Sequence, residues 1–537
     1  MTIGTQLRRA NIKDRYDSII IGSGIGGLAT AVCLAKAGQD VLVLERHYTA
    51  GGFTHTYSRK GYEWDVGVHY IGDVHRQEST LRRIFDFISD GELQWSEMEN
   101  IYDRIFIGSE SFDYVKGEEA FRDRMCQYFP EEKTAITEYL QLVKKVNRSV
   151  PSYYLEHALP SWLARILHKK LTTPFLKYAS RTTEEVLLGL TQNRKLIAVL
   201  TGQWGDYGLP PSQSSFAMHA LVAKHYLNGA SYPVGGSASI ARSIAAVLEK
   251  HKAQLITSAE VQSILTQGRK AVGVELLDGR KIHAKNIISG AGVINTFQQL
   301  LPVECPVKRE YMQNIKHVSP SFAHLCLYIG LKGTRQELGL HTSNLWIYPN
   351  EDHDQNIAQF RPKPSLKFPL VYISFPSSKD PLWEKEHPGK STIEIVVPAP
   401  IQWFEKWRGS KWQKRGAEYE QFKKEISDRL IEILLEKMPQ LKDKIHYFEL
   451  SSPLSTVHFS NYQQGEIYGI DHTPQRFQQR WLRTDTPVKN LYLTGQDIVT
   501  CGVGGALSAG VLTAIRVLGP FRSRPLVQLM KPKRRKS

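Results

Sequence analysis

The sequence predicts an α/β protein, and three observations near the N-terminus point to this fold class. An apolar run at 18–21 leads into a glycine-rich turn, and a segment of small apolar residues at 28–35, which favours a helix, follows the turn. A second apolar run at 41–44 then ends on Glu45. Continuous apolar runs of this length are typical of strands buried in a parallel sheet. Strand, turn, helix and strand in this order predict a Rossmann-type unit.

The glycines of the turn have the spacing of a dinucleotide-binding site. Gly22 permits a tight turn, Gly24 lets the backbone approach a pyrophosphate, and Gly27 lets the helix pack closely on the sheet. The N-terminus of the helix offers free N–H groups to the phosphates. Glu45 follows Gly22 by 23 residues, which suits an acid that accepts from ribose hydroxyls. The residues predicted to contact a cofactor here are Gly22, Ser23, Gly24, Gly27, Glu45 and Arg46.

Two further segments favour FAD over a nicotinamide cofactor. A second glycine pair, Gly51-Gly52, closely follows Glu45, and it suits a backbone that passes the pyrophosphate and then the flavin. Near the C-terminus an apolar run at 490–493 ends on Gly495 and Asp497, and a helix rich in small residues follows. A late strand of this kind returns the chain to the first sheet, with its Asp at the ribityl and phosphate part of FAD. The predicted contacts here are Gly51, Gly52, Gly495, Asp497, Gly504 and Ala506.

These motifs, together with the run Gly67-Val68-His69-Tyr70-Ile71-Gly72, resemble the phytoene desaturase and carotenoid isomerase superfamily of FAD-dependent oxidoreductases. The run at 69–72 and the run Thr494-Gly495-Gln496-Asp497 resemble most its retinol saturase (all-trans-retinol 13,14-reductase) branch. The resemblance places Val261 at the adenine end of FAD and includes Gly292 among the cofactor contacts. One departure is Phe53-Thr54, where the branch usually has two cysteines.

The resemblance implies an amine oxidase or phytoene desaturase-like architecture. Segments 1–72, 232–292 and 490–520 together would form the FAD-binding domain, and insertions 73–231 and 293–489 would form an α+β substrate domain. Within them, Asp278-Gly279 predicts a hairpin turn, and apolar spacing at 419–438 predicts an amphipathic helix. Residues 521–537 form a basic tail that holds seven of the sixteen excess positive charges.

Composition excludes several classes of protein. The five cysteines of the 537-residue chain are scattered without a C-x-x-C pair, which argues for a reduced compartment and against a metal site or a disulfide framework. No nucleic-acid-binding motif accompanies the basic tail. The N-terminus lacks an apolar stretch after Arg8-Arg9, so we expect a protein that is not secreted and lies on the cytoplasmic face. Segment 498–519 is long enough to span a bilayer, yet its place after the flavin-site strand favours a buried closing helix.

A segment near 160–178 predicts peripheral membrane contact. Trp162, Leu163, Ile166, Leu167 and Leu171 share one helical face, with Arg165, Lys169 and Lys170 elsewhere. A basic amphipathic helix with a Trp suits the bilayer interface, although an ordinary helix packed on the core has the same pattern.

The function that these features predict is the saturation or desaturation of a conjugated double bond (CH–CH chemistry) in an apolar polyene, a retinoid or carotenoid. His69 and Tyr70 are the candidate catalytic residues, because they follow the first cofactor segment and donate hydrogen bonds; a core histidine is the alternative. Aromatic residues of the insertions are candidates to line a polyene tunnel or to form core: Trp204, Tyr207, Phe216, Tyr226, Trp346, Tyr348, Trp403 and Trp407.

Two other functions stay open. One is a redox-neutral carotenoid cis–trans isomerase that uses reduced FAD. The other is a non-catalytic lipid carrier on the fold of the GDP-dissociation inhibitors, since a fold alone does not fix function. The electron donor or acceptor is also open, because the chain has no second G-x-G-x-x-G motif.

Overall fold

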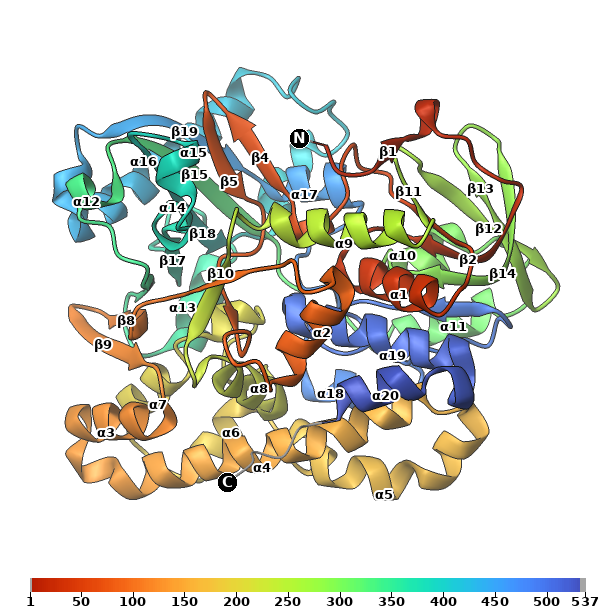
Figure 1. Ribbon diagram of the computed structural model, residues 1–537. Coiled ribbons are helices and arrows are strands. Elements are labelled where there is room, and N and C mark those ends of the chain that lie inside the picture. Colours follow the sequence, from red (N-terminus) through yellow and green to blue (C-terminus); the bar gives the residue numbers. More distant parts are fainter. Residues whose placement is uncertain (1, 532–537) are drawn as a thin grey trace.

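The structure of the protein is a computed structural model that describes residues 2–531, arranged around two large β-sheets (Figure 1). All eight strands of the first sheet come from three separated stretches of the chain. They follow the order β1-β11-β3-β2-β14-β13-β12, and β20 pairs with the end of β14. Their bounds are β1 Thr5–Gln6, β2 Arg15–Ile21, β3 Val41–Leu44, β11 Gln254–Thr257, β12 Val261–Gln267, β13 Lys270–Leu276, β14 Lys281–Ser289 and β20 Leu491–Leu493. The predicted α/β class, with a Rossmann-type sheet assembled from three segments, is confirmed.

Parallel pairing dominates this sheet because helices connect its strands. β11, β3, β2, β14 and β20 pair in parallel, whereas β12, β13 and β14 form an antiparallel meander. The predicted hairpin at Asp278-Gly279 joins β13 to β14, with Gly279 at φ +85°. Helices α1 (Ile25–Lys36), α9 (Ala238–Lys250) and α19 (Gly502–Arg522) cover the sheet and bury its apolar face.

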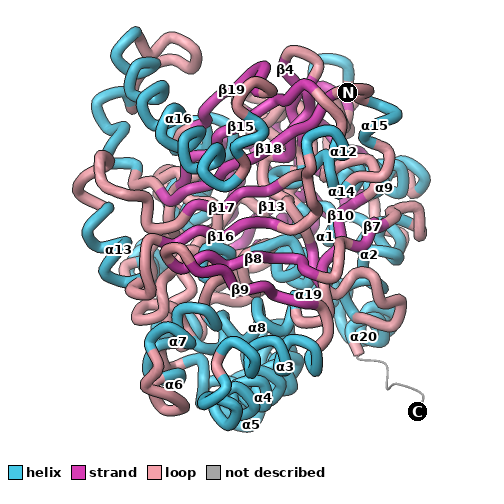
Figure 2. The backbone as a smooth tube through the Cα atoms, turned by 90° about the vertical axis from the view of Figure 1, so that its left-hand side faces the viewer, coloured by secondary structure: helices cyan, strands magenta, loops and turns pink. Residues whose placement is uncertain are grey.

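The second sheet is mixed and follows the order β19-β15-β18-β17-β16-β8-β9 (Figure 2). Every neighbouring pair is antiparallel except β16 with β8. All seven strands come from the two predicted insertions, so the expected α+β substrate domain is confirmed in architecture. Their bounds are β8 Ile101–Ile107, β9 Glu110–Val115, β15 His324–Lys332, β16 Asn344–Tyr348, β17 Val371–Ser374, β18 Lys390–Pro398 and β19 Ile445–Ser451.

Helices of the first insertion form a layer beside this sheet (Figure 2). They are α3 Glu118–Tyr128, α4 Lys133–Ala158, α5 Ser161–Ala179, α6 Thr183–Leu187, α7 Arg194–Leu200 and α8 Phe216–Tyr226. The predicted amphipathic helix is α16 (Ala417–Lys437), which buries Ile426, Leu430 and Leu434 against the sheet. The other α-helices of the second insertion are α10 Val293–Asn295, α11 Lys308–Ile315, α12 Arg335–Leu338, α13 His353–Phe360, α14 Pro376–Lys379, α15 Trp383–Glu386, α17 Pro453–Ser460 and α18 Pro474–Phe477.

Short strands connect the two halves. The hairpin of β4 (Thr56–Arg59) and β5 (Tyr62–Asp65) packs on β18, and β10 (Ala230–Pro233) pairs with β6 (Ile71–Gly72) and β7 (Trp95–Glu97). Helix α2 (Thr80–Ser89) packs beside α9 and α1 of the FAD-binding domain. The sequence instead predicts this segment at the start of the substrate domain. The chain therefore crosses between the two sheets several times.

Residues 521–531 of the predicted basic tail belong to the fold. Helix α20 (Arg524–Met530) buries Leu526 against α2 and α19, and Arg522 donates to the Ala37 carbonyl at 2.6 Å. The rest of that predicted tail, 532–537, lies outside the described residues. Helix α19 is long and apolar enough to cross a membrane, but it packs along α1 and half of its apolar window is buried.

Candidate active site

A cavity of about 1720 Å³ extends from the glycine-rich turn of the first sheet to the face of the second sheet. Its wall includes Gly22 and Glu45 at one end and Trp346 and Tyr372 at the other. The cavity therefore joins the predicted cofactor site to the substrate domain in one continuous space.

The turn between β2 and α1 has the conformation that its glycines predict. Gly22 has φ +92°, and α1 begins directly after Gly24. A Cβ atom on Gly27 would overlap the Gly22 carbonyl oxygen, so the helix packs here only with glycine. A Cβ atom on Gly24 would meet no atom within 4 Å, because Gly24 faces the cavity. Backbone N–H groups at this helix N-terminus are thus free to bind phosphate.

Glu45 lies on the cavity wall at the end of β3. Its carboxylate accepts from the backbone N of Ser23 at 2.8 Å and from the backbone N of His47 at 2.8 Å. Ser23 is fully buried behind the wall, and its hydroxyl donates to Glu45 at 2.7 Å. Ser23, which was predicted as a cofactor contact, holds Glu45 in place and does not itself line the cavity. Arg46 and Val261 both line this end of the cavity.

Two segments continue the wall beyond the turn. Gly51 and Gly52 have φ +122° and +55°, and Gly51 bridges to Gly24. Gly495, Gly504 and Ala506, also predicted as cofactor contacts, line the opposite side. Sequence reasoning missed Gly26, where a Cβ atom would stand 2.8 Å from the Cα atom of Gly495. The position of Gly26 between Gly24 and Gly27 was the sequence signal that could have identified it.

Two predicted cofactor contacts, Asp497 and Gly292, do not line the cavity, which is a correction to the prediction. The Asp497 carboxylate accepts from the backbone N of Val293 at 2.8 Å and from that of Ile470 at 2.9 Å. Both oxygens are thus occupied by neighbouring loops, and Gly292 packs against the same carboxylate. Asp497 joins the chain segments behind the site, and the adjacent Gln496 is on the wall instead.

Aromatic side chains form much of the far end. Of the eight predicted candidates, Trp204, Tyr226 and Trp346 line the cavity, while the other five do not. Those five, which pack within the core, are Tyr207, Phe216, Tyr348, Trp403 and Trp407. Phe322, Tyr372 and Tyr468, which the sequence did not single out, complete the aromatic lining.

His69 and Tyr70, the candidate catalytic residues, both lie on the cavity wall. Burial and, to a smaller extent, the nearby Lys379 together lower the pKa of His69 to about 4, so the ring is neutral at pH 7. Its Nδ1 atom lies 2.7 Å from Oε2 of Glu394, without the alignment of a hydrogen bond. The Tyr70 hydroxyl donates to Asp103 at 3.0 Å.

A buried cluster of titratable groups lies behind His69, and sequence reasoning missed it. Burial raises the pKa of Glu394 to about 8 and that of Asp65 to about 7, and it lowers the pKa of Lys379 to about 7. Lys379 donates to the His69 carbonyl at 3.0 Å and to the Ser374 hydroxyl at 2.7 Å. Residues 65, 379 and 394 are far apart in the sequence, so no local motif announces this cluster.

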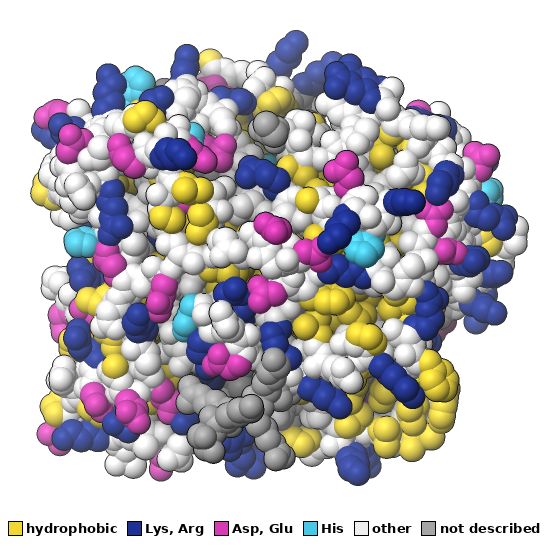
Figure 3. Space-filling model, viewed as in Figure 1, with side chains coloured by type: hydrophobic (Ala, Val, Ile, Leu, Met, Phe, Trp, Pro, Cys, Tyr) yellow, Lys and Arg dark blue, Asp and Glu magenta, His cyan; other side chains and the backbone are white. Residues whose placement is uncertain are grey.

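An apolar corner of the surface lies next to the cavity, where α4 meets α5 (Figure 3). Leu155, which lines the cavity, is 45% exposed, and Trp162 and Ile166 on α5 are 66% and 70% exposed. Leu163 of the predicted face is only half-exposed, and Ala164, Phe175 and Tyr178 pack inward. Arg165, Lys169, Lys170 and Lys177 are exposed on the same helix, which has no acidic residue.

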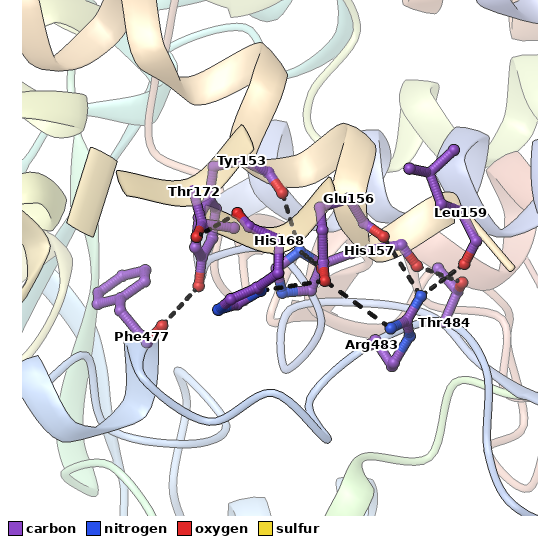
Figure 4. A network of polar contacts seen from close by, with 9 residues as sticks. All are labelled: Tyr153, Glu156, His157, Leu159, His168, Thr172, Phe477, Arg483 and Thr484. Carbon is purple, nitrogen blue, oxygen red and sulfur yellow. Dashed lines mark hydrogen bonds and ion pairs between the residues drawn. The ribbon is translucent and has the colours of Figure 1, made fainter. Parts of the chain in front are cut away.

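A polar network fixes this corner to the rest of the protein (Figure 4). Glu156 is buried between His168, whose Nδ1 atom is 3.3 Å away, and Arg483. Arg483 also donates to the Leu159 carbonyl at 2.5 Å, and Thr484 donates to the His157 carbonyl at 2.9 Å. These contacts hold the end of α4 and the start of α5 on the 477–484 loop.

The dinucleotide turn, the acid at the end of β3 and the late strand β20 define a flavoprotein, since the cavity beyond the glycine-rich turn is continuous with a separate substrate domain. Comparison with known proteins agrees. Residues 25–518 match the model of the family described as flavin containing amine oxidoreductase. The chain belongs to this family, and it is an FAD-dependent oxidoreductase.

Individual relatives are similar over nearly their whole length. The chain is 38% identical to an all-trans-retinol 13,14-reductase of Danio rerio, over 95% of this chain and 87% of that protein. It is 32% identical to an inactive all-trans-retinol 13,14-reductase of the same fish, over 94% and 86%. A chloroplastic prolycopene isomerase 2 of an Oncidium hybrid cultivar is 26% identical, over 96% and 86%. Among solved structures, putrescine oxidase bound to putrescine has a TM-score of 0.61 at 15% identity, over 94% and 99%, which shows the shared fold.

Proposed function

We propose that the protein is an FAD-dependent oxidoreductase that saturates a conjugated double bond in an apolar polyene of the retinoid class. The observation that carries the proposal is the cavity, which continues from the dinucleotide site into an aromatic chamber and reaches the surface beside Leu155. A long apolar chain fits such a space, because burial of its surface provides the binding energy. The similarity to all-trans-retinol 13,14-reductases supports this class of substrate.

FAD, when bound, supplies the two-electron chemistry of the reaction. The residues of the chain that would hold it are the N–H groups at the start of α1, Glu45, the pair Gly51-Gly52 and the start of α19. The substrate end binds and orients the polyene with Trp204, Tyr226, Trp346 and Tyr372, and the same aromatic wall excludes water. A conjugated chain spreads developing charge, whereas an isolated alkene does not, so a polyene suits this chemistry.

Anaerobic reduction and reoxidation test the proposal. The purified holoprotein is bleached with dithionite, excess reductant is removed, and all-trans-retinol or a carotenoid is added. We expect recovery of the oxidised flavin spectrum and formation of a dihydro product with retinol. Absence of reoxidation by every polyene, with unchanged products, would overturn the proposal.

The second candidate is a redox-neutral cis–trans isomerase, which the similarity to prolycopene isomerases supports more distantly. In that case the polyene changes its isomer composition while the flavin stays reduced. The lipid-carrier alternative predicts that the protein binds the polyene without any chemical change and does not require FAD.

We also propose that the α4–α5 corner contacts a membrane from its cytoplasmic face. Trp162 and Ile166 are exposed side by side on α5, among four cationic side chains, and the cavity reaches the surface nearby. An entry at the bilayer would let a water-insoluble substrate pass directly into the cavity.

Liposome flotation tests this contact. The Trp162→Asp/Ile166→Asp variant should lose most binding to vesicles of mixed zwitterionic and anionic lipid, because two charges replace the apolar face. The matched control is Leu277→Asp/Val303→Asp, which changes two equally exposed apolar residues elsewhere. Equal flotation of both variants would contradict membrane contact at this corner.

A further inference from the structure

A buried carboxyl group, Asp103, and a partly buried one, Asp206, share one phenol at the substrate end of the cavity. The hydroxyl oxygen of Tyr70 lies 3.0 Å from Oδ2 of Asp103 and 3.2 Å from Oδ2 of Asp206. Asp206 ends the short 3-10 turn Trp204–Asp206, and its side chain lines the cavity together with Tyr70. Neither carboxyl belongs to the dinucleotide site.

The geometry determines which carboxyl holds a proton. A phenol has one hydrogen to donate, so both contacts are hydrogen bonds only if one carboxyl is itself a donor. Asp103 also accepts from Gln203 at 2.7 Å and from Asn344 at 2.8 Å, and these donors stabilise a negative charge there. Asp206 has the Tyr70 hydroxyl as its described side-chain partner. The Asp206 carboxylic acid therefore donates to the Tyr70 hydroxyl oxygen, and the Tyr70 hydroxyl donates to the Asp103 carboxylate.

The surroundings of Asp206 favour the same protonation state. Burial raises the pKa of Asp206 well above its usual range, and the negative charge of Asp103 raises it further. The pKa of Asp103 is raised only to about 6, because Asn344, Gln203 and Tyr70 donate to it. The other titratable groups that face Asp206 are tyrosines and a cysteine: Tyr207, Tyr226, Tyr348, Tyr372, Tyr468 and Cys501.

We propose that Asp206 is the acid that delivers the proton to the polyene, and that Tyr70 is a positioning residue which holds and tunes it. This step rests on the proposed reductase function. In one turnover, FAD bound in its reduced form would supply a hydride (two electrons and one hydrogen) to one carbon of a C=C bond, and the Asp206 carboxyl gives its proton to the other end of the conjugated system. The C=C π bond, the bond that held the hydride on reduced FAD and the O–H bond of Asp206 break, two C–H bonds form, and FAD is left oxidised.

After transfer, the Asp206 carboxylate would accept the Tyr70 hydrogen bond, and it regains a proton from solvent when the product leaves the cavity. The proposal assigns Asp206 a chemical role that neither His69 nor Tyr70 fills. His69 is neutral at pH 7 and lies against the buried Glu394, and burial raises the pKa of Tyr70 well above its usual range.

The test uses single turnovers of the reduced holoenzyme. Asp206→Asn should keep FAD and slow the polyene-dependent reoxidation about 100-fold or more, because loss of a general acid typically costs two to four orders of magnitude. The control is Asp354→Asn, which removes a half-buried carboxyl of the same domain that is bonded to Ser212 and lies away from the cavity. Unchanged reoxidation in Asp206→Asn, with an active wild type, would overturn the proposal.

Two further readouts separate this step from the function itself. The infrared difference spectrum of the wild-type holoprotein minus Asp206→Asn, at neutral pH and without substrate, should contain the carbonyl stretch of one neutral carboxylic acid. The bands of Glu394 and Asp65, whose pKa values are also raised, are common to both proteins and cancel. Turnover should fall as pH rises through the raised pKa of Asp206. Tyr70→Phe should move that fall to higher pH, because the Tyr70 hydroxyl donates to the deprotonated Asp206 carboxylate and so lowers the pKa of Asp206. A wild type with the infrared band but without turnover contradicts the reductase function, whereas a missing band contradicts the role of Asp206.

Discussion

At the dinucleotide end of the cavity the wall is mostly backbone, whereas at the substrate end it is mostly side chains. Gly22, Gly24 and Gly27 shape the first end, and what matters there is the absence of Cβ atoms. Tyr70, Trp346 and Tyr372 shape the second end, together with buried groups whose pKa values are strongly displaced. At Gly26 and Gly27 an added side chain would clash with backbone atoms, whereas the substrate end depends on the protonation state of a few side chains.

The largest effect should come from adding atoms at the backbone end. Gly27→Val places its side chain on the Gly22 carbonyl oxygen, so either the helix or the strand must move. We expect purified protein without flavin absorbance and a free energy of unfolding lowered by about 4 kcal/mol. Gly409→Val is the control, because a Cβ atom there meets nothing within 4 Å. Retention of normal flavin content by Gly27→Val would contradict a backbone-built site.

A change at the substrate end should separate cofactor binding from turnover. His69→Ala removes a neutral ring from the cavity wall but touches none of the predicted phosphate contacts. We expect full FAD content and about 100-fold slower turnover, the size expected when a substrate is misplaced. His75→Ala changes a nearby histidine that is off the cavity wall and should leave turnover unchanged. Full turnover in His69→Ala would remove His69 from the candidate catalytic residues.

A milder change tests the one acidic side chain that the backbone end does use. Glu45→Gln keeps the shape of the side chain but removes the charge that accepts from the backbone N–H groups of Ser23 and His47. We expect the dissociation constant of FAD to rise about tenfold, equivalent to about 1.4 kcal/mol, as measured by fluorescence titration of the apoprotein. Glu249→Gln, on the exposed side of α9 and off the cavity wall, is the control and should bind FAD normally.

The effect that is smallest at neutral pH concerns stability at acid pH. His219 lies among helices of the substrate domain, where burial lowers its pKa to about 3. The unfolded chain binds a proton near pH 6.5 and the folded protein does not, so stability is full above about pH 6.5 and falls as the pH drops toward 3. His219→Gln should remove about 1.4 kcal/mol per pH unit from this slope in urea titrations. The exposed His341→Gln is the control, and an unchanged slope in His219→Gln would show that His219 is protonated in the folded state.

The sequence by itself determined the fold class, the cofactor and most of the dinucleotide end. These depend on glycine spacing and on strand and helix periodicity, which are local properties, so Gly22, Gly24, Gly27, Glu45 and Gly51 lie where the motifs predict. Motifs do not specify side-chain direction: Asp497 follows its strand as predicted, yet its carboxylate binds backbone N–H groups behind the wall.

Only the tertiary structure decided the substrate end. Asp103 and Asp206 are separated by about a hundred residues and meet at Tyr70, and Lys379 reaches the His69 carbonyl from 310 residues away. Their unusual protonation states arise because the two sheets bury them together away from water, and burial is a property of the folded chain. In the same way, the sequence predicts a basic tail from residue 521, whereas the structure folds Arg524–Met530 into a helix that buries Leu526 against α2 and α19.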